Sequence, residues 1–141
     1  MTINDRPSVF RTALGWLGAV ANLLLGLYFC ALGTLGLIVG GDMFVPLAPV
    51  PPESAALALL LLGAFAAAAS LLALSGGKLL RAPLLLWAVA LFLTLAWAVL
   101  RSDYRFDGME GFKAHGLMLL GSLALVYAGW ARYRTPLPNR Y

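Results

Sequence analysis

The chain has 141 residues, of which 62% are hydrophobic and 11% are charged, and its formal net charge is +4. Soluble domains contain about 45–50% apolar and about 25% charged residues. A water-soluble core of this size does not need so much apolar side chain, so the surplus is expected to face lipid. The composition therefore excludes an ordinary soluble domain and indicates a membrane protein.

Four apolar runs make up most of the sequence, and they cover residues 12–40, 55–74, 84–100 and 112–131. Each run reaches or nearly reaches the roughly 20 residues that cross about 30 Å of hydrocarbon as a helix. Charged residues lie at the ends of the runs. We therefore predict an all-α, four-helix transmembrane bundle with short loops. No segment outside the runs is long enough to bury its own core, so residues 1–141 are expected to form a single integral membrane domain.

The distribution of basic residues predicts the orientation. Seven of the ten lie on the side of the two termini: Arg6, Arg11, Lys78, Arg81, Arg132, Arg134 and Arg140. The other side has Arg101, Arg105 and Lys113, together with five of the six acidic residues. The positive-inside rule then predicts cytoplasmic termini, with loops 41–53 and 101–111 facing outward. Since these cations flank the spans, we expect no nucleic-acid partner, and the Ala-, Leu-, Gly- and Arg-rich composition favours a bacterial inner membrane.

The first span carries a stripe of small or polar residues at steps of three, four or seven, which lie along one face of a helix. The predicted packing residues are Gly15, Ala19, Asn22, Gly26, Gly33, Gly36 and Gly40. In lipid, helices associate by close backbone approach over small residues and by interhelical hydrogen bonds. The first span is therefore the predicted centre of packing, with Asn22 bonding across helices. The alternative is that Asn22 lines a small polar path with hydroxyl residues of the spans, namely Thr34, Ser70, Thr94 and Ser122.

Helix-stop signals separate the second and third spans. Residues 75–77 read Ser-Gly-Gly, and Pro83 suits the first turn of a following helix. This connection is short, so the two spans are predicted to form an antiparallel hairpin. Aromatic residues mark the membrane boundaries, with Trp16, Trp130 and Tyr133 expected at the cytoplasmic one.

Most of the polar chemistry lies in residues 101–115. The candidate residues of an outward docking or cation site are Asp103, Tyr104, Arg105, Asp107, Glu110 and His115. The carboxylates suit a hard cation, but no ligand spacing is diagnostic, so we assign no metal. The segment is also compatible with an epitope that pairs with a partner's charges, or with a solvated loop whose charges neutralise each other.

Catalytic motifs are missing from the sequence. It contains no nucleophile–base pair, phosphate-binding loop or zinc spacing, and no span carries the carboxylate that proton-coupled exporters use. We therefore expect no enzyme and no cofactor. The predicted function is an accessory, assembly or regulatory subunit in the lipid bilayer that packs against a larger membrane protein or itself. The alternatives are a small oligomeric channel or carrier, and a haem- or quinone-binding membrane subunit. Haem would be held by His115 with Met109 or Met118, or by His115 from each of two copies.

Overall fold

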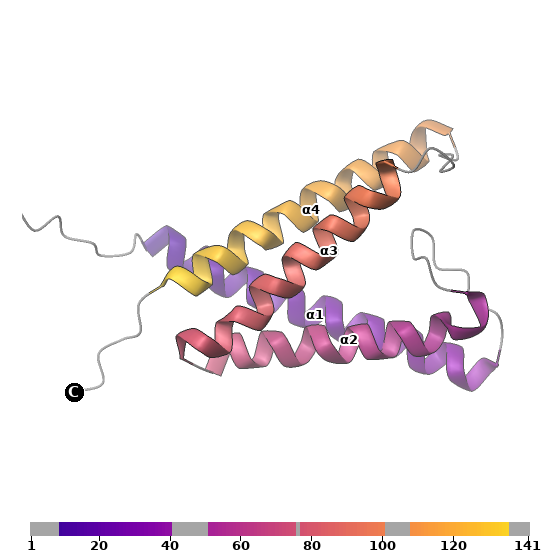
Figure 1. Ribbon diagram of the computed structural model, residues 1–141, viewed down its shortest axis with the longest axis horizontal. Helices are drawn as coiled ribbons and strands as arrows, with labels where there is room; N and C mark the ends of the chain where they lie inside the picture. Colours follow the sequence, from indigo (N-terminus) through magenta and orange to yellow (C-terminus); the bar gives the residue numbers. More distant parts are fainter. Residues whose placement is uncertain (1–8, 41–50, 76, 101–107, 136–141) are drawn as a thin grey trace, which may run out of the picture.

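The computed structural model describes residues 9–40, 51–75, 77–100 and 108–135 (Figure 1). They form four long helices and one short 3-10 turn: α1 (Val9–Val39), α2 (Pro52–Ser75), η1 (Lys78–Arg81), α3 (Ala82–Leu100) and α4 (Gly108–Arg134). All four long helices are long and apolar enough to cross a membrane. The prediction of an all-α bundle with four candidate spans is confirmed.

Each helix begins a few residues before its predicted apolar run. The largest extension at a helix start is at α4, which begins at Gly108 and not near Phe112. Gly108 has a φ of 69°, in the left-handed region that favours glycine, and it leads the chain into the helix. Gly111 lies inside α4 and does not interrupt it.

Two helix pairs make up the bundle, as Figure 1 shows. Antiparallel α1 and α2 lie side by side and share the most extensive interface, and α3 and α4 form the second pair. The pairs meet where α1 begins and where α2 and α4 end, which we call the basal end. They diverge toward the opposite, open end, so the bundle is V-shaped and not closed.

Glycines bring the α1 and α2 backbones into direct contact. A Cβ built on Gly26 would lie 2.7 Å from the amide nitrogen of Ala67 and 2.9 Å from the carbonyl oxygen of Gly63. A Cβ on Gly33 would lie 2.5 Å from the amide nitrogen of Leu60. Any side chain at these positions would push the helices apart, which explains why glycine occupies them.

The start of α1 uses its small residues against a different helix. A Cβ on Gly15 would lie 3.0 Å from the backbone of Arg132, and one on Gly18 would overlap the side chain of Ala128. Both neighbours belong to α4. The stripe on α1 therefore serves two helices in turn, α4 at the basal end and α2 beyond it.

Gly40 differs from its predicted role in the packing stripe. It is exposed, and a Cβ on it would meet nothing within 4 Å in the described part of the chain. Its φ is 68°, and its amide donates to the carbonyl oxygen of Gly36 at 3.1 Å. Gly40 therefore ends α1 as a left-handed C-terminal residue, a role that glycine fills because it has no Cβ.

The predicted hairpin of α2 and α3 exists only near its turn. η1 joins the two helices at the basal end, but their interface is the smallest of the four principal helix–helix interfaces. The rings of Phe65 and Trp87 stand between them with centroids 5.7 Å apart. Large rings hold helix axes farther apart than the glycines between α1 and α2 do, so α3 diverges from α2.

The open-end halves of α3 and α4 form what we call the outer arm, residues 89–100 and 108–121. No described side chain in either segment is buried. The nearest buried residues are Ala88 on α3 and Ser122 on α4. Neither α1 nor α2 covers the arm, which presents apolar side chains to its surroundings.

Candidate functional site

A buried polar cluster joins three helices around Asn22, which is 1% exposed. Its amide nitrogen donates to the hydroxyl of Ser70 at 2.9 Å and to the carbonyl oxygen of Ala66 at 3.2 Å. Its amide oxygen accepts a hydrogen bond from the indole nitrogen of Trp87 at 3.0 Å. The Ser70 hydroxyl in turn donates to the Ala66 carbonyl oxygen at 2.8 Å. One amide thus connects α1 to both α2 and α3.

The hydrogen-bonding capacity of this cluster is used internally. Both amide hydrogens of Asn22 and its oxygen have partners, as an amide buried among apolar side chains requires. Two other hydroxyls of the predicted polar path bond to their own helices. Thr94 donates to the carbonyl oxygen of Ala90, and Ser122 donates to that of Leu119, each at 2.8 Å.

Arg132 closes the basal end of α2, although it belongs to α4. The residue is 4% exposed. Its Nε donates to the carbonyl oxygen of Ala73 at 3.0 Å, and an Nη donates to that of Leu74 at 3.3 Å. The guanidinium also lies 4.3 Å from the ring centroid of Trp16. A cation at this position satisfies carbonyls that the last turn of α2 leaves without helical partners, and it complements the negative end of the helix dipole.

Arg81 performs the same task for α4. It is 3% exposed, and its Nη1 donates to the carbonyl oxygen of Arg132 at 3.1 Å and to that of Thr135 at 2.6 Å. Arg132 on α4 therefore caps the end of α2, and Arg81 in η1, which follows α2, caps the end of α4. This capping adds a structural role to cations predicted from the sequence as topology signals.

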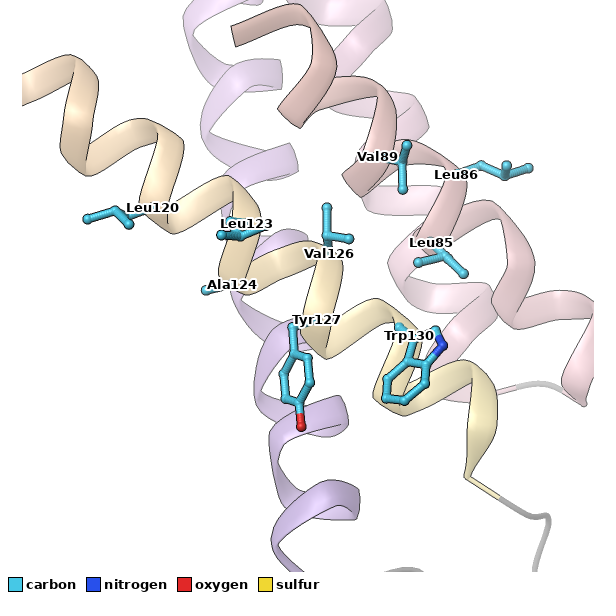
Figure 2. Close-up of a pocket in the computed structure, with 9 residues that line it drawn as sticks. All are labelled: Leu85, Leu86, Val89, Leu120, Leu123, Ala124, Val126, Tyr127 and Trp130. Carbon is cyan, nitrogen blue, oxygen red and sulfur yellow. The ribbon is translucent and has the colours of Figure 1, made fainter. Parts of the chain in front are cut away.

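An apolar groove of about 1070 Å³ lies between α3 and α4 in the basal half of the pair (Figure 2). The residues that line it are Leu85, Leu86, Val89, Leu120, Leu123, Ala124, Val126, Tyr127 and Trp130. All are aliphatic except Tyr127 and Trp130, which lie near the basal end. The Tyr127 and Trp130 rings lie 6.0 Å apart. The guanidinium of Arg134 lies 5.0 Å from the Trp130 ring centroid, so the basal end of the groove leads to a cation.

The predicted outward polar segment lies mostly outside the described residues, which include neither Asp103, Tyr104, Arg105 nor Asp107. Two of its candidates are described. Glu110 is exposed in the first turn of α4. His115 is partly buried, with Nδ1 2.7 Å from the carbonyl oxygen of Gly111. The docking and cation hypotheses for this segment stay predictions. Within the described ranges, no group of three or more His, Cys, Asp or Glu side chains could hold a metal.

No protein-family model, curated protein or solved structure matches the sequence.

The structure buries six of the predicted packing residues: Gly15, Ala19, Asn22, Gly26, Gly33 and Gly36. The sequence interpretation missed the partner of Asn22 on α3 and both arginine caps. Trp87 carried a usable signal, because an indole N–H in the interior of a span needs an acceptor, and Asn22 has the one amide side chain within the spans. The caps had no comparable signal, since their acceptors are main-chain carbonyls of other helices.

Proposed function

We propose that this chain is a non-catalytic accessory, assembly or regulatory subunit whose outer arm packs against the helices of a partner. The partner is a larger membrane protein or another copy of the chain. We further propose a bacterial inner-membrane location with both termini in the cytoplasm.

The open space around two glycines of the outer arm carries this proposal. A Cβ on Gly116 or Gly121 would meet nothing within 4 Å in the described part of the chain, whereas Gly26, Gly33 and Gly63 all contact a neighbouring backbone. Glycine inside a helix costs roughly 1 kcal/mol relative to alanine. In membranes, small residues concentrate where helices approach each other closely. Open glycines on an uncovered arm thus favour a docking face for helices outside this chain.

The charge asymmetry supports the proposed orientation. At the basal end the described cations are Arg11, Lys78, Arg81, Arg132 and Arg134. At the open end the described charged side chains are Glu110, in the first turn of α4, and Lys113. Basic residues concentrate on the cytoplasmic side of membrane proteins, which favours a cytoplasmic basal end.

The channel or carrier alternative has less support, because several of the groups expected to line its path are bonded within the bundle. Asn22, Thr94 and Ser122 all have intramolecular partners. Flux assays in vesicles separate the two hypotheses. Selective uptake that is lost in Asn22→Leu would favour the channel and count against the subunit proposal.

The haem-binding alternative depends on His115, whose Nδ1 lies within hydrogen-bonding distance of its own helix at Gly111. The described methionines that could serve as a second ligand, Met109 and Met118, are both exposed on the outer arm. An absorption spectrum of the purified protein tests this alternative. A Soret band that disappears in His115→Ala would support haem over the subunit proposal.

The subunit proposal is tested by extraction in a mild detergent and quantitative mass spectrometry of co-purified proteins. We expect a stoichiometric partner with the wild-type chain and at least tenfold less of it with Gly116→Ile or Gly121→Ile. Ala64→Ile is the control, because Ala64 is exposed on α2 and also gains an isoleucine side chain. Equal recovery from all variants would contradict a docking face on the arm. Asp103→Lys and Asp107→Lys test separately whether the predicted outward segment contributes.

A further inference from the structure

We propose that the α3–α4 groove binds one anionic phospholipid, with an acyl chain in the groove and the phosphate at Arg134 and Lys78. This site lies in the basal half of the pair. It adjoins the outer arm, with which it shares Val89 and Leu120, but it does not depend on the docking proposal.

The shape and lining of the groove suit an acyl chain. Leu85, Leu86 and Val89 border it on α3, and Leu123 and Val126 border it on α4 (Figure 2). A volume of about 1070 Å³ is comparable to pockets that hold whole small ligands. In a bilayer, a concave hydrocarbon surface left unfilled would lose dispersion contacts on both walls, so a lipid chain fills it. In the groove an acyl chain is contacted by side chains of two helices, whereas on the face of a single helix it is contacted from one side only.

The headgroup position follows from the residues at the basal end of the groove. Trp130 lines the groove there, and the exposed Arg134 holds its guanidinium 5.0 Å from the Trp130 ring centroid. A guanidinium carries five N–H donors, which can bind a phosphate. Tryptophan is typical of the headgroup level of membranes. The Trp130–Arg134 pair thus places a phosphate-binding cation next to the acyl-chain groove.

Lys78 supplies a second exposed cation at the same end. It lies in η1, directly before α3, with its Nζ 5.3 Å from the ring centroid of Tyr133 on α4. The nearby Arg81 and Arg132 are buried and donate to main-chain carbonyls, so they add positive potential without being exposed ligands.

This charge favours an anionic headgroup over a zwitterionic one. Among the described residues of the basal end there is no Asp or Glu to offset the cations. A basic residue close to an anionic lipid surface strengthens binding by about fivefold. Removing either exposed cation is therefore expected to weaken lipid retention by about that factor.

The test is native mass spectrometry of the full-length protein released from mixed micelles. The micelles contain equal amounts of phosphatidylglycerol and phosphatidylcholine with identical acyl chains. We expect the wild-type protein to retain one phosphatidylglycerol in preference to phosphatidylcholine. Arg134→Gln and Lys78→Gln are each expected to reduce phosphatidylglycerol retention about fivefold, while Lys113→Gln at the open end leaves it unchanged.

A second pair of variants tests the groove itself. Ala124→Phe fills the groove and is expected to reduce retention of both lipids, whereas Ala64→Phe on the exposed face of α2 does not. Thermal unfolding of each variant verifies folding, and Val89→Phe replaces Ala124→Phe if the latter is unfolded. Three results would overturn the proposal: equal retention of the two lipids by the wild type, equal effects of Arg134→Gln and Lys113→Gln, or equal effects of the groove and α2 variants. A retained molecule with the mass of a neutral isoprenoid would overturn it as well.

Discussion

The indole of Trp87 donates a hydrogen bond to the amide oxygen of Asn22 across 3.0 Å and so joins α3 to α1. The backbones of these two helices otherwise approach each other at few points. The bond lies close to where the outer arm begins, since Ala88 is the last buried residue before the open end of α3. It therefore fixes the position from which the arm diverges from the α1–α2 pair.

Removing either partner of this bond is expected to destabilise the protein. Asn22→Leu leaves the Trp87 N–H without its acceptor and costs about 1–2 kcal/mol, while Trp87→Phe keeps a ring against Phe65 and costs about 1 kcal/mol. The measurement is the free energy of unfolding in detergent micelles. The control is Thr94→Val, which removes a bond within one helix and is expected to cost under about 0.5 kcal/mol. Losses no greater than that of the control would show that the cluster does not hold the helices together.

Gly26 packs against the backbone of α2 and Gly116 faces open space, so the same substitution at both positions makes a matched pair of variants. Gly26→Val forces a side chain against the backbone of α2 and is expected to cost about 3 kcal/mol or more. Gly116→Val introduces the same side chain into open space and is expected to leave the isolated protein within about 0.5 kcal/mol of the wild type. Thermal unfolding in detergent measures both. Comparable losses of stability at the two positions would mean that Gly116 packs against another helix of the same chain, which would contradict the structure.

The capping role of Arg132 predicts a loss that its exposed neighbour does not share. Arg132→Gln removes charge-assisted hydrogen bonds to the end of α2 and the contact with Trp16, and it is expected to cost about 2 kcal/mol. Arg134→Gln in lipid-free detergent removes an exposed cation and is expected to cost under about 0.5 kcal/mol. Arg132→Lys should lie closer to the glutamine variant than to wild type, because a lysine cannot reproduce the forked donor geometry. Chemical denaturation ranks the three variants, and a larger loss of stability in Arg134→Gln than in either Arg132 variant would contradict the capping role.

The proposed orientation predicts which exposed positions react with a membrane-impermeant maleimide. In a Cys30→Ala background, a cysteine at Met109 near the start of α4 should be labelled on intact cells. A cysteine at Leu79 in η1 should be labelled after the cells are permeabilised. The reverse pattern would show that the basal end faces outward.

The spans and one packing face were predictable from the sequence because both follow from local periodicity. Apolar length determines a span, and the spacing of small residues determines a stripe on α1. Periodicity on one helix does not say which neighbour each part of the stripe contacts. Gly15 contacts α4 and Gly26 contacts α2, and these partners depend on how all four helices cross.

The predictions that were wrong or incomplete have equally specific physical causes. Gly36 and Gly40 are four residues apart and look alike as a packing pair, but α1 ends between them, so Gly40 takes a left-handed conformation instead. The short turn after α2 correctly indicated antiparallel neighbours at the basal end. It could not show that the rings of Phe65 and Trp87 separate the helices beyond it. Likewise, the acceptors of the Arg132 cap are main-chain atoms, which leave no mark on composition or spacing.

The most direct test of the proposed function is photo-crosslinking in native membranes from two exposed positions. A photoreactive phenylalanine analogue replaces Met118 on the outer arm in one variant and Leu61 on α2 in the other. We expect a discrete protein adduct from position 118 and lipid adducts from position 61. An adduct of twice the 15.0 kDa chain would identify another copy as the partner, and any other protein mass would identify a different one. Lipid adducts alone from position 118 would contradict a docking role for the arm.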